Sequence, residues 1–241
     1  MKQITPIFKR EFVGYFRTPV AYVFLVAFLV MSVALAFSRF GRFFESRIAS
    51  LEIYFQFFPW LFLFVVPAVG MRLWSEEKRS VTAELLFTLP VTTLEAVVGK
   101  FLAGWAFLTL AIVLSFPMAI TVGYLGNPDW GVVATTYLGA ILLAGGYLGV
   151  CSLTSALTKN QVVSFVLSLC ACAALVFLGY SGFTSSLENV LPVGVAEAVS
   201  NFSFITHFSP FVKGIIDVKD VVFFLSLMGF TLFLNVVALE R

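Results

Sequence analysis

The sequence predicts an all-helical integral membrane protein, a class indicated by its composition and by the length of its apolar runs. Of its 241 residues, 60% are hydrophobic and only 12% are charged. The mean hydropathy of +1.01 lies far above the range of soluble domains. A helix needs roughly 20 apolar residues to cross a hydrocarbon core about 30 Å thick. Six runs meet this need, at about 20–38, 54–73, 96–122, 131–157, 162–182 and 220–239. Each run is apolar on all sides, which favours helices over the alternating strands of a membrane barrel.

A separate amphipathic helix is predicted ahead of the first run, over residues 3–18. At about 100° per residue, its aromatic side chains fall on one arc and its basic side chains on another. Thr5 can cap its start ahead of Pro6, and Thr18-Pro19 marks a break before the first span. We expect an elbow helix in the headgroup layer; the alternative is a simple extension of the first span. The residues expected at the membrane interface are Phe8, Lys9, Arg10, Phe12, Phe16 and Arg17.

The basic residues predict which side of the membrane each loop occupies. With six spans both chain ends share one side, and that side would carry ten Lys and Arg residues against five on the other. Positive charge is enriched in cytoplasmic loops, so both termini are expected in the cytoplasm. The first run lacks a small-residue cleavage pattern, and we interpret it as an uncleaved span. The net charge of +2 comes without a concentrated basic face, so nucleic acid is not an expected partner.

The longest segment on the outer side, residues 183–219, is too polar to span and too apolar to lie free in water. We expect short re-entrant or interfacial helices here, before the last span, covering the outer end of the bundle. The chain's single histidine, His207, lies in this segment without a neighbouring Cys, Asp or second His in the sequence. A structural role is therefore favoured over a metal ligand or a base.

Two patterns inside the spans concern packing. The run at 131–157 is rich in Gly and Ala, which predicts a face where another helix approaches closely; the alternative is a helix that is merely flexible. Cys170 and Cys172 would point about 200° apart on a helix. Small packing residues are favoured over a soft-metal pair.

Motifs for local chemistry are missing from the sequence. The Gly99-Lys100 pair lacks the rest of a phosphate-binding loop, because Leu94 stands where Gly is required and Phe101 where Ser or Thr is required. Zinc-protease and serine-nucleophile motifs are also missing. The spans carry no ionisable group deeper than their ends, which disfavours an ion-driven carrier. We expect no enzyme and no cofactor bound by this chain.

The most informative segment is 74–90, a charged and amphipathic stretch between two apolar runs. Ser75 is a reasonable N-cap for a short surface helix, Glu76 and Glu77 suit its positive start, and an apolar stripe follows. Thr92-x-x-Glu95 is a capping box that would start the third span. The charges place the segment at an aqueous face, while its apolar side needs a partner; the alternative is a solvated inside loop.

This segment also carries a family resemblance. Ser75-Glu-Glu-Lys-Arg-Ser-x-Thr-x-Glu-Leu-Leu-x-Thr-Leu-Pro90, followed by Gly99-Lys100, resembles the coupling segment of type-2 ATP-binding-cassette (ABC-2) exporter permeases. The branch that it is most similar to includes gliding-motility and nitrous-oxide-reductase-maturation permeases. Thr206-His-Phe208, Gly214-Ile-Ile-Asp217 and the ending Leu239-Glu240-Arg241 also resemble that branch. Val81 departs from the Gly that many relatives carry. The resemblance covers nearly the whole chain, so we treat 1–241 as one permease domain.

The resemblance implies a bacterial inner-membrane permease with six spans and an elbow helix. It implies pairing with a second copy or a paralogue, and a separate ABC ATPase dimer that carries ATP and Mg²⁺. That ATPase would receive a coupling helix at 74–90. The expected contact residues are Trp74, Ser75, Glu76, Glu77, Lys78, Arg79, Val81, Glu84, Leu85, Leu86 and Leu89.

Three functions follow from the resemblance and the charge pattern. The first is export driven by the separate ATPase. The second is an ATP-driven mechanotransducer that moves a periplasmic accessory protein docked on 183–219 without bulk transport. The third is a membrane scaffold without an ATPase.

Overall fold

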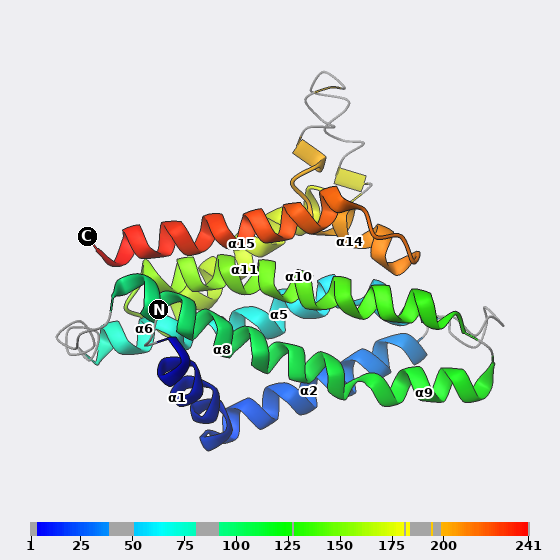
Figure 1. Cartoon of the computed structure of the whole chain (residues 1–241), viewed down its shortest axis with the longest axis horizontal. Coiled ribbons are helices and arrows are strands. Elements are labelled where there is room, and N and C mark those ends of the chain that lie inside the picture. Colours follow the sequence, from blue (N-terminus) through cyan, green and yellow to red (C-terminus); the bar gives the residue numbers. More distant parts are fainter. Residues whose placement is uncertain are drawn as a thin grey trace.

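The computed structural model describes residues 4–38, 51–80, 92–126, 128–180, 182–183, 194 and 199–240. Over these residues the regular structure is helical, and no strand occurs among them. Most helices run along the long axis of the molecule, whereas α1 (Ile4–Arg17) is steeply inclined to them (Figure 1). The expected all-helical class is confirmed at this level.

Five helical stretches in the described part of the chain are long and apolar enough to cross a membrane. They correspond to five of the six predicted runs, with small shifts at their ends. They are α2 (Pro19–Phe37), α5 (Phe58–Gly70) continued by α6 (Arg72–Arg79), α8 (Thr93–Leu114) continued by α9 (Phe116–Leu125), α10 (Trp130–Ala156) and α15 (Val218–Leu239).

The sixth predicted run, 162–182, forms the shorter helix α11 (Gln161–Phe177). Its 17 residues rise about 26 Å, less than a typical hydrocarbon core. Beyond Phe177 the chain turns, and an added Cβ at Gly179 would collide with Ser203 Oγ. The helix therefore ends before the predicted boundary near residue 182, and α11 alone does not meet the length expected of a full crossing.

Helix starts follow the capping residues in the sequence. The predicted box at Thr92 and Glu95 is present, with each side chain bonded to the other residue's backbone N–H. Asp129 and Asn160 cap α10 and α11 by accepting a hydrogen bond from the N–H two residues on. Thr18 stands at the N-cap of α2 with Pro19 in the first helical position, so the predicted break between α1 and the first span is confirmed. The predicted cap at Thr5 is wrong, because Thr5 lies inside α1.

The core is organised around α10, which contacts α5, α8, α11, α15 and the short helix α14 (Phe204–Val212). Its small residues are the points of contact, as predicted. A Cβ added at Gly145 would lie 2.5 Å from the Met228 sulfur of α15, and one at Gly139 would lie 2.6 Å from the Phe211 Cβ of α14. Close approach of this kind gives van der Waals contact between helices where lipid offers no hydrophobic drive for their association.

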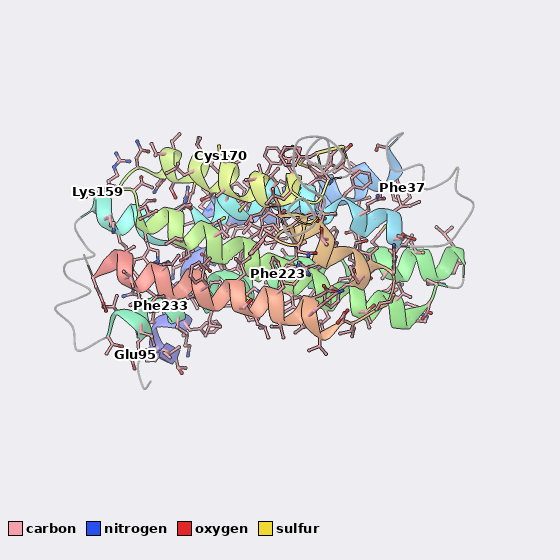
Figure 2. The ribbon with its side chains drawn as sticks, turned by 90° about the horizontal axis from the view of Figure 1, so that it is seen from above. Phe37, Glu95, Lys159, Cys170, Phe223 and Phe233 are labelled. Atoms are coloured by element: carbon pink, nitrogen blue, oxygen red, sulfur yellow. The ribbon has the colours of Figure 1, made fainter. Side chains whose placement is uncertain are left out.

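The two ends of the bundle differ. Both chain termini, α6 and the start of α8 lie at one end, which we call the terminal end (Figure 1). Glu95 and Lys159 also lie there, whereas Phe37 lies at the opposite end, which we call the distal end (Figure 2). The distal end also holds α14 and the far end of α9 (Figure 1). Between the ends, large apolar side chains such as Phe233 (Figure 2) are exposed along the bundle, as a lipid-facing surface requires.

Candidate functional site

A buried lysine organises the terminal end of the bundle. Lys100 lies in α8 with a side chain only 3% exposed, and its Nζ is 2.6 Å from Glu77 Oε1 of α6. The same Nζ donates a hydrogen bond to the Leu73 carbonyl at 3.1 Å and lies 3.6 Å from Glu11 Oε1 of α1. It also sits 5.0 Å from the centre of the Trp74 ring, within cation–π range. One ammonium group therefore joins α1, α6 and α8.

A buried serine joins α6 to the end of α10. The Ser155 hydroxyl accepts hydrogen bonds from the backbone N–H groups of Trp74 and Ser75, each at 3.1 Å. It donates in turn to the Met71 carbonyl at 3.0 Å. Nearby, Lys78 Nζ donates to the last carbonyl of α10. These contacts fix the joint between α5 and α6 at Met71 against α10.

The third contact at this end is between α1 and α8. A Cβ added at Gly99 would lie 2.8 Å from Ile7 Cγ2, so only glycine allows the two helices to come this close. Further along, the ring of Tyr15 stacks on Phe107 with centroids 4.9 Å apart. Burial raises the pKa of the Tyr15 hydroxyl above its usual range; the Glu11 carboxylate raises this pKa further and the Arg72 guanidinium lowers it. Tyr15 therefore stays neutral at physiological pH.

The predicted interface residues of α1 divide according to their chemistry. The aromatic ones are partly buried, and Phe8 and Phe12 stack with centroids 5.6 Å apart. The basic ones, Lys9, Arg10 and Arg17, are exposed. This is the amphipathic arrangement that the 100° spacing predicts.

The predicted ATPase-contact residues fall into three groups. Trp74 and Ser75 are fully buried inside the chain's own bundle. Glu77 and Lys78 are partly exposed but already bonded to α8 and α10, while Glu76 and Arg79 are exposed. The remaining predicted contacts lie outside the described residues: Val81, Glu84, Leu85, Leu86 and Leu89.

One local prediction about this segment is wrong. Ser75 is not a helix N-cap, because α6 already begins at Arg72. Its hydroxyl instead donates to the Met71 carbonyl one turn back in the helix. In place of an N-cap at Ser75, the Ser155 hydroxyl accepts hydrogen bonds from the backbone N–H groups of Trp74 and Ser75 in the first turn of α6.

Three of the residues that form the polar contacts at the terminal end were not expected there. Lys100 stood in the sequence only as half of a Gly-Lys pair, and Glu11 and Ser155 carried no local signal. Their partners lie many positions away, 23 for Lys100 with Glu77 and 80 for Ser155 with Ser75. Only an isolated charge inside an apolar run, as at Lys100, could have indicated a buried pair.

At the distal end, His207 has two polar partners. Its Nδ1 lies 2.6 Å from Asp220 Oδ1 of α15, and its Nε2 lies 2.7 Å from the Asn201 carbonyl. Its ring stacks on Phe223 (Figure 2) with centroids 3.9 Å apart. A carbonyl can only accept, so Nε2 donates to the Asn201 carbonyl. The contact of Nδ1 with the Asp220 carboxylate holds α14 to α15.

No group of three or more metal-ligating side chains occurs within the described ranges. Cys170 is exposed and Cys172 is buried, as their angular separation predicts. The Cys172 sulfur lies 3.9 Å from that of Cys151 in α10, which is a packing contact between two free thiols.

Comparison with protein-family models and with curated proteins finds no match for this chain. The site itself contains one buried cation, its carboxylate partners and backbone hydrogen bonds. Such an arrangement fixes the positions of the helices relative to one another, so these contacts are structural.

Proposed function

We propose that this chain is the membrane permease subunit of an ATP-driven exporter of the ABC-2 class, working with a separate ATPase. One observation carries the proposal: α6 is joined by polar contacts to α8 and α10, and the same Lys100 of α8 also pairs with Glu11 of α1. A displacement of α6 would therefore move α8 and α10 directly, and α1 through Lys100. The segment that follows α6, residues 80–90, is the part of the chain on which the ATPase would act.

In this proposal the residues of segment 74–90 have two roles. Trp74 and Ser75 act by positioning α6, since both are buried in the bundle. Direct contact with the ATPase falls to exposed Glu76 and Arg79 and to the apolar stripe after them. ATP and Mg²⁺ are held by the ATPase, and its closure would move the spans between two arrangements.

The same proposal completes the topology. The helix α11 would be the sixth crossing, although its 17 residues are fewer than a full crossing usually needs. The inclined helix α1 would lie in the cytoplasmic headgroup layer, and α14 would be re-entrant at the outer face. Both termini would then be in the cytoplasm of a bacterium, at the terminal end. A second copy or a paralogue would complete the permease.

Co-purification tests this function directly. The variant Glu84→Lys with Leu85→Asp places a reversed charge and a buried carboxylate in the expected groove contact, so the ATPase should no longer co-purify with the membrane protein. A matched control, Asp129→Asn at the distal end, should leave co-purification unchanged. Retention of the ATPase by the double variant would refute docking through this segment.

A mechanotransducer is the second candidate, and the packing of α14 favours it. The hydroxyl of Thr136 in α10 donates to the Phe211 carbonyl of α14 at 3.0 Å, and the His207–Asp220 pair holds α14 to α15. Movements of α10 and α15 would therefore be transmitted to α14, which belongs to the outer segment 183–219. ATPase activity stimulated only by a periplasmic protein would support the transducer, whereas substrate-stimulated flux in proteoliposomes would support the exporter.

A further inference from the structure

A cavity of about 250 Å³ lies beside the joint between α1 and α2, bounded also by α5, α6 and α8. Its lining is divided by chemistry. Glu11, Arg72 and Glu76 supply charge near the terminal end, while Phe24, Ala68 and Phe107 supply an apolar wall. A pocket with a few charged groups and an otherwise apolar lining is typical of ligand sites.

The charged part of this cavity can receive both an anion and a cation. The Arg72 Nε is buried and has no hydrogen-bond partner among the described residues, which is costly for a guanidinium group. The Glu76 side chain is exposed, and the Glu11 carboxylate lies 2.8 Å from Arg10 and 3.6 Å from Lys100. An acceptor would satisfy the Arg72 Nε, and a donor would pair with the exposed Glu76 carboxylate, next to Glu11, which already pairs with Arg10.

A second cavity of about 460 Å³ lies next to the first, against α2 and α5. The two share Phe24 and Ala68, and the second is bordered by Met31 of α2, Phe64 of α5 and Phe165 of α11. Its lining is almost wholly apolar. Met31 is 50% exposed and Phe64 is 59% exposed, so this groove opens on the side surface of the bundle, where lipid would lie.

The two cavities follow one face of each helix. Val20, Phe24 and Met31 recur along α2 at helical spacing, as do Arg72, Ala68 and Phe64 along α5 and the start of α6. A ligand lying in both would have its charged group at the terminal end and its apolar part directed toward the centre of the bundle. That is the orientation of a phospholipid in the leaflet at this end.

We propose that these joined cavities bind a phospholipid whose headgroup carries both a phosphate and a primary ammonium, that is, an ethanolamine phospholipid. The phosphate accepts hydrogen bonds from Arg72, and the ammonium donates to Glu11 and Glu76. One acyl chain fills the groove beyond Phe24. A choline headgroup lacks N–H donors for the carboxylates, and a glycerol headgroup lacks the cation. Glu76 also belongs to the proposed ATPase contact, but lipid binding is tested on this chain without an ATPase, so failure of one proposal is distinguishable from failure of the other.

Native mass spectrometry of the purified full chain tests the site. The chain would be titrated with dioleoyl phosphatidylethanolamine, phosphatidylcholine and phosphatidylglycerol. We expect one ethanolamine lipid to bind about tenfold more tightly than either of the others. Equal binding of the three lipids, or tightest binding of the glycerol lipid, would overturn the assignment.

Variants separate this site from general attraction to lipid. Arg72→Gln and Glu76→Gln should each weaken ethanolamine-lipid binding about tenfold. Arg17→Gln removes an exposed charge of α1 that does not line the cavity, and it should leave binding unchanged. Because Glu76 is exposed, its variant tests the site even if Arg72→Gln fails to fold. A loss of binding as large in Arg17→Gln as in Glu76→Gln would refute the site.

A further experiment tests whether the apolar groove takes part in lipid binding. Phosphoethanolamine without acyl chains carries the same charged groups, and we expect it not to displace the lipid at the same concentration. Ala68 lines both cavities, so Ala68→Phe would fill part of each and should reduce lipid binding. Displacement by the soluble compound, together with unchanged lipid binding in Ala68→Phe, would show that the groove takes no part.

Discussion

Lys100 of α8 and Glu77 of α6 form an ion pair whose Nζ–Oε1 distance is 2.6 Å, although 23 positions separate the two residues. The Lys100 side chain is 3% exposed, and that of Glu77 is 21% exposed. A charge with so little access to water persists only when it is paired and hydrogen-bonded. The pair therefore identifies the position of α6 against α8 as a fixed feature of the fold.

Removing the lysine charge should destabilise this joint. In Lys100→Met, the Glu77 carboxylate loses its partner and the Leu73 carbonyl loses a donor. We expect the apparent free energy of unfolding in detergent to fall by about 2 to 3 kcal/mol, below the loss for a fully buried pair because Glu77 keeps some contact with water. Thermal or denaturant unfolding would measure the change.

The double variant Lys100→Met with Glu77→Met provides the control. Replacing both members of a buried pair by apolar residues is often close to neutral. The double variant should therefore be more stable than Lys100→Met alone. The single variant Glu77→Met completes the comparison. If the stability losses of Lys100→Met and Glu77→Met add up to that of the double variant, the ion pair has no coupling energy and its role in the joint is refuted.

Gly99 is predicted to be essential for the packing of α1 on α8. In Gly99→Val the Cβ would meet Ile7, since an added Cβ lies 2.8 Å from Ile7 Cγ2. We expect a loss of about 1 to 3 kcal/mol from overpacking. Adding Ile7→Ala should recover part of it by removing the colliding group. Gly229→Ala in α15, where the added Cβ meets nothing within 4 Å apart from the neighbouring residues of its own helix, should cost nothing measurable. Recovery no greater than that from an unrelated Ile→Ala change would argue against the contact.

The apolar helices could be predicted from the sequence because each is specified locally. The capping box at Thr92 and Glu95 and the break at Thr18-Pro19 depend on residues within one helical turn, and both predictions are confirmed. The helix α11 ends before the predicted boundary, and Gly179, just beyond its end, packs on Ser203, which is distant in the chain. A hydropathy run does not contain that contact.

The terminal-end site could be predicted only in outline. The segment after residue 74 was singled out because charges interrupt apolar runs, and α6 does carry those charges. The burial of Trp74 and Ser75 could not be foreseen, because it depends on Ser155 and Lys100 arriving from α10 and α8. Similarly, His207 was expected to be structural, but its partner Asp220 belongs to the next helix.

Ser155 is expected to stabilise the joint at Met71 through its hydrogen bonds. In Ser155→Ala, two backbone N–H groups lose this acceptor in a buried setting, and we expect a loss of about 1 to 3 kcal/mol. Ser226→Ala is the matched control, because the Ser226 hydroxyl is exposed and bonds only to the carbonyl one turn back, that of Phe223. Unfolding in detergent would compare the two. Equal stability of the two variants would show that Ser155 contributes no more than a surface hydroxyl.

At the distal end, the His207–Asp220 pair yields the last prediction. In Asp220→Asn the side chain still fits, but a neutral amide replaces the carboxylate whose oxygen lies 2.6 Å from His207 Nδ1. Breaking a buried pair from one side costs about 3 to 5 kcal/mol, so this variant should be strongly destabilised.

The variant His207→Phe with Asp220→Leu removes both polar groups and keeps the stack on Phe223, which has centroids 3.9 Å apart in the native chain. Because no charge is left unpaired, it should be more stable than Asp220→Asn, while the Asn201 carbonyl loses its donor. Cysteines introduced in α14 and α15 would report, by cross-linking rate, whether the two helices remain together. The pair acts as a tether if cross-linking falls in Asp220→Asn and returns in the apolar double variant. Unchanged cross-linking in Asp220→Asn would mean that apolar packing alone holds α14, and the proposed route from the spans to the outer segment would lose its polar link.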